Sequence, residues 1–352
     1  MPQTQKLPAA MLLSAVLLSP LGHASNTETF EWTLDPAASI ANTSTTIKGV
    51  QHVGLSVKDL QSMLDFYQTS TGFKLIERKT VANSPAADSI FGQVDVEFEY
   101  ALLESSTMRL ELYQFANEKN SAPLNLPVQG PGITHTCYQS AVTNSLYDKF
   151  TTAGATMISR GDKPVDAGGY GVHYAYARDP EGNIFELEAI DQTLINKSGY
   201  DSNWQVQGGE AWMTQVAFAT HDLNRLVSFY AQMLDINPYR TGDYSDNRKL
   251  DDIANIDDLS LSATWFKMDG EGKVLEFWEY NNPKTVAKRQ KTTPTQLGYS
   301  FSFEVGDIQQ EYTRLRALGV SFIAPPLQLG EHLMSFAHDP DGNLFSLRQK
   351  AL

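Results

Sequence analysis

The sequence predicts an α+β fold made of four copies of one unit, each consisting of a strand, a helix and several further strands. The first observation is a repeat: residues 59–67 (DLQSMLDFY) return as residues 222–230 (DLNRLVSFY). The second is an Asp-Pro-acid-Gly-Asn turn followed by an alternating strand, found at 177–190 and again at 337–350. One unit of this size cannot complete a hydrophobic core alone, so we expect the units to pack in pairs.

The first repeated stretch predicts a strand followed by an amphipathic helix. Each copy comes after a run of alternating apolar residues, which is typical of a half-buried strand. Each helix begins with an aspartate, Asp59 or Asp222, that can cap its first turn, and its apolar residues recur at i, i+3, i+4 and i+7.

Two more strand–helix units precede the repeated turns. A strand at 132–140 leads into a helix at 142–153 that Gly154 closes, and a strand at 297–305 leads into a helix at 307–318 that Gly319 closes. The four units therefore start near residues 50, 133, 212 and 298, and are called units one to four below.

The N-terminus is predicted to be a secretory signal peptide. Lys6 precedes an apolar stretch that is too short to cross a bilayer, and small residues lie at −3 and −1 before Ser25. We expect cleavage after Ala24 and a periplasmic or secreted protein. The expected organisation is a signal peptide at 1–24, a polar leader at 25–48, a metal-binding pair of units at 49–190, a linker at 191–211 and a degenerate pair of units at 212–350.

Composition and charge limit the possible partners. Hydrophobic residues make up 41% of the chain and charged residues 19%, as in a globular protein. The net charge of −14 argues against nucleic acid and membrane surfaces, so we expect a small-molecule substrate and a monomer or homodimer. Cys137 is the only cysteine, which excludes a disulfide within the chain.

Four potential metal ligands occupy comparable places in the first half. His52 and His135 lie in the first strands of units one and two, and Glu111 and Glu186 lie in the last strands of the same units. If a pseudo-two-fold axis relates the units, the four side chains converge. Two imidazoles and two carboxylates suit Zn²⁺, Ni²⁺, Fe²⁺ or Mn²⁺.

The second half offers a comparison for these positions. Repeat alignment places other residues opposite His52, Glu111, His135 and Glu186: they are Gln215, Glu276, Ser300 and Ser346. Only the glutamate recurs, so we expect the second half to bind no catalytic metal. On the same grounds we expect unit one to pair with unit two.

These motifs, in this order, resemble the vicinal oxygen chelate superfamily, which includes glyoxalase I, extradiol dioxygenases and fosfomycin- and bleomycin-resistance proteins. The resemblance covers about residues 50–350 and implies four βαβββ modules that form two curved-sheet domains. The glyoxalase I pattern of His, Glu, His, Glu implies that His52, Glu111, His135 and Glu186 bind the metal. Glu188 competes with Glu186, but its spacing from the Asp-Pro-x-Gly turn favours Glu186.

The resemblance implies a metal-dependent lyase or isomerase acting on a small substrate chelated through adjacent oxygens. Glu186 or Glu111 would be the catalytic base. One alternative is an Fe(II) extradiol-type dioxygenase using His52, His135 and Glu186, because "YARDPEGNIFE" resembles the end of that signature. In either case Tyr176 and His173 can line the pocket. Another alternative is a non-catalytic protein that binds a small molecule.

Overall fold

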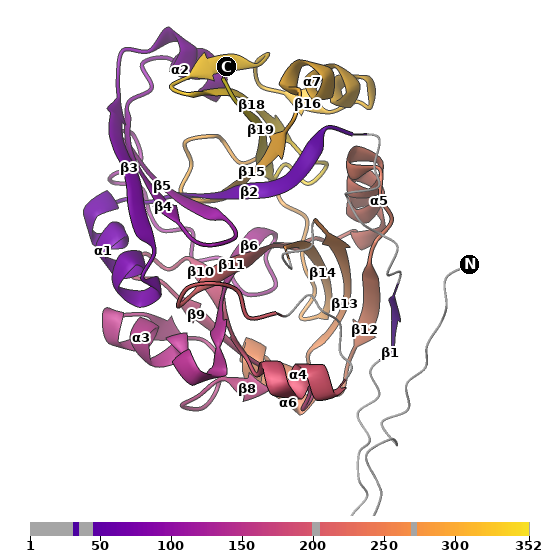
Figure 1. The fold of residues 1–352 in the computed structure, drawn as a ribbon. Coiled ribbons are helices and arrows are strands. Elements are labelled where there is room, and N and C mark those ends of the chain that lie inside the picture. Colours follow the sequence, from indigo (N-terminus) through magenta and orange to yellow (C-terminus); the bar gives the residue numbers. More distant parts are fainter. Residues whose placement is uncertain (1–30, 35–44, 199–204, 269–272, 352) are drawn as a thin grey trace, which may run out of the picture.

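The computed structural model describes residues 31–34, 45–198, 205–268 and 273–351. The predicted signal peptide, residues 1–24, lies outside the described residues. Figure 1 shows two curved sheets, one above the other, with helices at the sides and at both ends. This confirms the predicted α+β class with two curved-sheet domains. Among the described helices, none is long and apolar enough to cross a bilayer.

The upper sheet of Figure 1, here called sheet B, combines units one and four. In the described part of the chain it has nine strands, in the order β16-β18-β19-β15-β2-β5-β4-β3, with β17 paired to β18. The strands are β2 (Ile47–Ser56), β3 (Lys74–Val81), β4 (Phe98–Glu104), β5 (Arg109–Phe115), β15 (Gly298–Val305), β16 (Ser321–Phe322), β17 (Leu327–Leu329), β18 (His332–His338) and β19 (Leu344–Lys350).

The lower sheet, sheet A, combines units two and three. Its ten described strands follow the order β1-β12-β13-β14-β11-β6-β10-β9-β7, with β8 paired to β9. They are β1 (Glu31–Leu34), β6 (Gly132–Ala141), β7 (Thr156–Met157), β8 (Val165–Asp166), β9 (Val172–Arg178), β10 (Ile184–Ile190), β11 (Trp212–Ala219), β12 (Arg240–Tyr244), β13 (Ser260–Lys267) and β14 (Val274–Asn282). The part of the polar leader that forms β1 thus pairs with β12.

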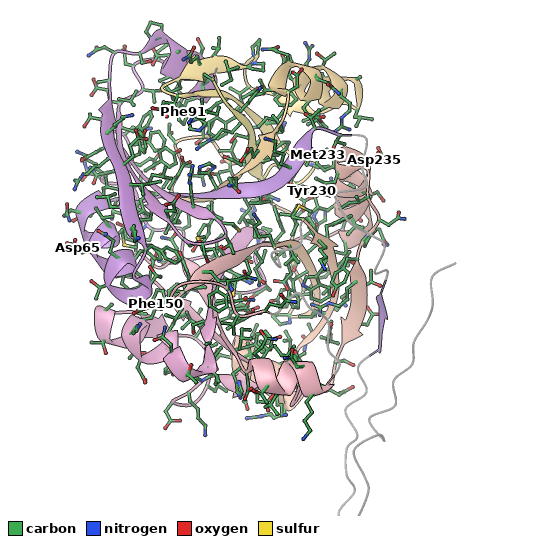
Figure 2. All side chains as sticks on the ribbon, in the orientation of Figure 1. Asp65, Phe91, Phe150, Tyr230, Met233 and Asp235 are labelled. Carbon is green, nitrogen blue, oxygen red and sulfur yellow. The ribbon has the colours of Figure 1, made fainter. Side chains whose placement is uncertain are left out.

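The expected pairing of unit one with unit two is wrong. Instead, the first strands of units one and four, β2 and β15, pair antiparallel, and so do the first strands of units two and three, β6 and β11. Units one and two do touch, but through helices: α1 (Leu60–Thr71) packs against α3 (Leu146–Ala153), with the Phe66 and Phe150 rings 5.5 Å apart. Figure 2 labels Phe150 on α3, and its ring belongs to one apolar core that all four units share.

The helices of units one and three begin at the predicted aspartates. The Asp59 side chain accepts the backbone N–H of Ser62 at the start of α1, and Asp222 accepts that of Arg225 at the start of α5 (Leu223–Leu234). In unit two, α3 begins at Leu146 and not at the predicted residue 142, because a 3-10 turn at Val142–Asn144 precedes it. The other described helices are α2 (Pro85–Phe91), α4 (Gln192–Ser198), α6 (Arg248–Ala254) and α7 (Ile308–Ala317).

The two Asp-Pro-acid-Gly-Asn turns tie neighbouring units together through buried aspartates. Asp179 accepts the Tyr67 hydroxyl of α1 at 2.9 Å, and Asp339 accepts the Tyr230 hydroxyl of α5 at 3.1 Å. Each aspartate also accepts backbone N–H groups of its own turn. Burial raises the pKa of both carboxyl groups from 3.8 to about 6.

These aspartates predict how stability depends on pH. Because the folded pKa lies above the unfolded one, their contribution is fully present below about pH 4 and is lost as the pH rises to about 6. A shift of about two pKa units corresponds to about 3 kcal/mol for each group. Urea denaturation between pH 4 and 6.5 should show this loss, and Asp179→Asn should remove about half of it, because Asp339 remains. An Asp179→Asn curve with the wild-type slope would contradict the prediction.

Candidate metal centre

Four polar side chains meet on one face in the middle of sheet A. The strands β14, β11, β6 and β10 are consecutive neighbours there, and they supply the first and last strands of units two and three. Each side chain is buried, with exposed fractions between 2% and 6%. The four residues are His135, Glu186, Gln215 and Glu276.

The four side chains surround one point. His135 Nε2 lies 3.8 Å from Glu186 Oε2 and 3.7 Å from Glu276 Oε2. The Gln215 amide donates to both carboxylates, at 3.0 Å in the case of Glu276. Ligand atoms of His135, Glu186 and Glu276 all lie within 4.8 Å of one another, which is close enough for one ion to contact all three.

This donor set fits a divalent metal ion. His135 Nε2 is buried and has no hydrogen-bond partner among the described residues, while Nδ1 of the same ring contacts Thr134 Oγ1 at 3.0 Å. Leaving a buried polar nitrogen unpaired next to two buried carboxylates is costly unless a cation joins them. One imidazole nitrogen with carboxylate and amide oxygens suits Zn²⁺, Ni²⁺, Fe²⁺ or Mn²⁺.

Three buried glutamates, Glu186, Glu188 and Glu276, lie close together at the site. Burial, together with Glu188 and Glu276, raises the pKa of Glu186 well above its ordinary value. The Trp265 indole N–H donates to Glu276 Oε1. Burial also raises the pKa of the Cys137 thiol well above its usual range, which makes it a poor nucleophile.

The site opens into a pocket. Six of its thirteen lining residues are aromatic, and the Tyr176 ring centre lies 5.0 Å from that of the His135 imidazole. The lining residues are Ala167, Tyr170, Tyr174, Tyr176, Glu186, Glu188, Arg240, Tyr244, Leu250, Ile253, Trp265, Glu276 and Trp278.

The structure divides the four predicted ligands between the two sheets. His135 and Glu186 meet in sheet A, whereas His52 and Glu111 lie in sheet B. The prediction that all four share one site is therefore wrong, because unit one pairs with unit four. The predicted dioxygenase triad of His52, His135 and Glu186 is not assembled for the same reason.

An arginine occupies the place beside Glu111 in sheet B. The Arg348 guanidinium donates two hydrogen bonds to the Glu111 carboxylate, and the Tyr113 hydroxyl donates a third at 2.7 Å. Burial opposes the charge on Glu111, but Arg348 outweighs it and lowers the pKa of Glu111 to about 2. Glu111 is thus already neutralised by a side chain.

The rest of the sheet B site offers few metal ligands. Burial and Arg348 lower the pKa of His52 to about 3, and both of its ring nitrogens lack hydrogen-bond partners among the described residues. The positions equivalent to His135 and Glu186 carry Ser300 and Ser346, and Ser346 hydrogen-bonds Ser302 at 2.6 Å. A neutral histidine without a free carboxylate does not make a comparable site.

The alternation of side chains along a strand decides which of the remaining predicted residues line the pocket. Tyr176 and Glu188 line the pocket, and Glu188 accepts the Gln139 amide. His173 does not line the pocket, because successive residues of β9 face opposite sides and His173 lies three positions from Tyr176.

Two site residues, Gln215 and Glu276, are not among the ligands predicted from the sequence. They align with His52 and Glu111, and the prediction takes the glutamine as the loss of a ligand. A glutamine amide oxygen can serve as a ligand where an imidazole does, so the repeat alignment itself contained the signal. The second half was expected to bind no catalytic metal, yet it supplies two of the four side chains of the cluster in sheet A, Gln215 and Glu276.

Comparison with known proteins places the chain in a family. Residues 49–187 and 212–347 match the model of the Glyoxalase/Bleomycin resistance protein/Dioxygenase superfamily. The crystal structure of glyoxalase I from Zea mays is similar, with a TM-score of 0.57, 18% identity, and coverage of 86% of this chain and 92% of that chain. A putative dioxygenase from Bacillus subtilis has a TM-score of 0.50, 12% identity, and coverage of 87% and 86%.

At these identities the two structures show the likeness of fold alone. An uncharacterized protein of Bacillus subtilis, YurT, is 44% identical over 48 residues, a stretch that is 14% of this chain and 38% of that protein. The two matches to the family model cover most of the chain and coincide with the two halves of the repeat. The protein belongs to the Glyoxalase/Bleomycin resistance protein/Dioxygenase superfamily.

Proposed function

We propose that the protein is a metal-dependent, glyoxalase I-like lyase or isomerase whose small oxygenated substrate binds through adjacent oxygens. The observation that carries the proposal is the buried His135 Nε2, which has no hydrogen-bond partner among the described residues and faces two buried carboxylates at the end of a pocket.

His135, Glu186, Gln215 and Glu276 would hold the ion. When bound, a divalent cation supplies a Lewis acid that polarises a carbonyl and stabilises an enediolate. Gln215 now directs its amide N–H group at the two carboxylates. A half-turn of the terminal amide exchanges nitrogen and oxygen, so the same side chain can present its oxygen to the cluster.

Glu186 is the residue best suited to move a proton. Its carboxylate lines the pocket, within reach of a bound substrate, and as a carboxylate it can take a proton from a carbon next to a carbonyl. Glu111, the other candidate base, is held in an ion pair with Arg348 in sheet B and is a weak base, with a pKa of about 2.

The cluster favours this chemistry over that of a dioxygenase. A two-His-one-carboxylate triad needs a second histidine, and the described cluster in sheet A contains one. Two carboxylates, an amide and one imidazole support a lyase or isomerase, in which a carboxylate also accepts a proton.

The first prediction concerns metal content. Protein purified without oxygen should contain one metal ion per chain by elemental analysis. His135→Ala and Glu276→Gln should each reduce metal affinity at least about tenfold, because each removes a direct ligand. His52→Ala is the matched control, a buried histidine in sheet B, and should retain the metal. A wild-type protein without metal would leave the non-catalytic binding protein as the better function, and metal loss in His52→Ala would contradict the assigned site.

The second prediction concerns the ion pair of sheet B. Glu111→Gln leaves the buried Arg348 without its counter-charge and should lower the free energy of unfolding by about 3–5 kcal/mol. Urea denaturation measures this loss, and the combined Glu111→Leu, Arg348→Met variant should recover much of it. The folded Glu111→Gln protein should keep its metal, so a drop in metal per folded chain would argue against the assignment.

The third prediction concerns export, which we include in the proposal. The charge at Lys6, the short apolar stretch and the small residues before Ser25 support cleavage after Ala24. Mass spectrometry of the protein from the periplasm or medium of a bacterial host should find a chain that begins at Ser25. A full-length chain that stays in the cytoplasm would refute export and leave the metal chemistry untouched.

A further inference from the structure

We infer that the pocket beside the candidate metal centre receives the aromatic ring of a compact substrate, an aryl-substituted 2-hydroxy or 2-oxo carbonyl compound. The inference rests on the proposed function for the adjacent pair of oxygens. The ring itself is inferred from the pocket wall and from a comparison of the two sheets.

Six aromatic side chains contribute to the pocket wall, and they come from five segments in both halves of the chain. Trp265 and Trp278 meet edge to face, with ring centres 5.4 Å apart, and Tyr244 meets Trp265 in the same way at 6.4 Å. Opposite strands add Tyr174 and Tyr176. Faces and edges of aromatic side chains attract another ring by stacking and edge contacts, beyond simple burial of apolar area.

In sheet B the region that corresponds to the pocket is filled by side chains of the protein itself. There Phe91 of α2, labelled near the top of Figure 2, packs against Phe98, Phe115 and Phe336 with ring centres 5.3–5.4 Å apart. These rings belong to one apolar cluster, together with Met334 and Leu344. Side chains from the protein itself thus occupy the concave side of sheet B.

Two ring positions of this region, Phe91 and its neighbour Tyr100, which contacts Phe98, correspond to alanines in sheet A. Helices α2 and α6 have the same length, and matching their N-caps, Ser84 and Asn247, places Ala254 opposite Phe91. Matching the pairs of β4 with β5 and of β13 with β14 places Ala263 opposite Tyr100. Both alanines lie in the apolar cluster that contains Tyr176 and Trp265 of the pocket wall. Neither alanine lines the pocket, but both pack in the cluster behind its wall, where sheet B has rings. The pocket beside this cluster can receive a substrate ring.

The walls of the pocket are fixed in place, as a ring-sized site requires. Helix α6 contributes Leu250 and Ile253, and the Ser159 hydroxyl donates to the Ile253 carbonyl at 2.6 Å. Arg160 donates to Asn255 just beyond the helix end at 2.8 Å. These bonds join unit two to unit three across the pocket, so its shape depends on both halves of the chain.

The charges of the lining exclude a substrate with several acidic groups. The lining carries one arginine, Arg240, and three glutamates. Their formal charges sum to −2, which a divalent cation would bring to zero. Arg240 already lies over the Trp265 ring, 3.8 Å from its centre. A peptide conjugate with two carboxylates would find too few cations, whereas a neutral or singly charged aryl compound fits.

The test uses two probes that differ only in the ring. Mandelate and lactate both place a hydroxyl beside a carboxylate, but mandelate carries a phenyl group where lactate has a methyl group. Isothermal titration of the metal-containing protein should give a Kd for mandelate at least about tenfold below that for lactate. A ratio within about twofold, in protein with a full metal content, would overturn the inference while leaving the proposed function intact.

Variants of the wall separate ring binding from general damage. Trp278→Leu should reduce the mandelate preference to about threefold or less, with the Kd for lactate and the metal content unchanged. Ala167→Phe, at a lining position, should fill the ring space and reduce the preference in the same way. Tyr312→Leu, on α7 and outside the lining, is the control and should leave the ratio unchanged. A folded Trp278→Leu protein with the wild-type ratio would count against the inference.

A third probe distinguishes failure of the inference from failure of the proposed function. Benzoate carries the ring without a neighbouring hydroxyl, so its binding to His135→Ala protein, followed by tryptophan fluorescence, reports the aromatic wall alone. Benzoate binding that Trp278→Leu weakens, in a protein that never holds metal, would support the pocket and refute the metal-dependent function. Absence of both metal and benzoate binding would refute both.

Discussion

The antiparallel pairing of β6 with β11 is the interaction on which the candidate centre depends. It places the first strand of unit two beside the first strand of unit three and sets Ala217 opposite His135. The parallel neighbours β10 and β14 then complete the four central strands. The cluster and its pocket therefore belong to neither half of the sequence, because each half supplies two of the four polar side chains.

The two sheets solve the same electrostatic problem differently. A buried glutamate recurs at the equivalent positions 111 and 276. In sheet B the Arg348 guanidinium provides the opposite charge, and apolar rings fill the remaining space. In sheet A the position equivalent to Arg348 is Glu188, so three glutamates gather in the pocket lining. Sheet B thus has a packed core at this place, whereas sheet A has a pocket whose carboxyl groups a divalent cation would balance.

Local features of the fold could be predicted from the sequence, whereas the strand pairing could not. Caps such as Asp59 and strand positions such as His135 depend on a few neighbouring residues, and these expectations agree with the structure. The pairing of units is non-local. Four units with similar apolar strands offer several ways to form two sheets, and no periodicity distinguishes them.

The error over the site has a chemical cause as well. Ligand types favour the pairing of unit one with unit two only if glutamine is not a metal ligand. With Gln215 as a donor, the pairing of unit two with unit three also offers a cluster, so the ligand types do not choose between the two pairings. The misplaced His173 is different, because its odd spacing from Tyr176 already placed it on the other face of the strand.

The two sheets also stabilise each other, so sheet B contributes to the candidate centre of sheet A. All four units contribute to one core between the sheets. The Tyr67–Asp179 and Tyr230–Asp339 hydrogen bonds join sheet B elements to sheet A elements, once on each side of the pseudo-two-fold axis. A closely packed core transmits strain, so loosening sheet B would change the backbone that positions His135 and Gln215. Sheet B, in which Arg348 balances Glu111, therefore contributes to the candidate site by keeping the strands of sheet A in place.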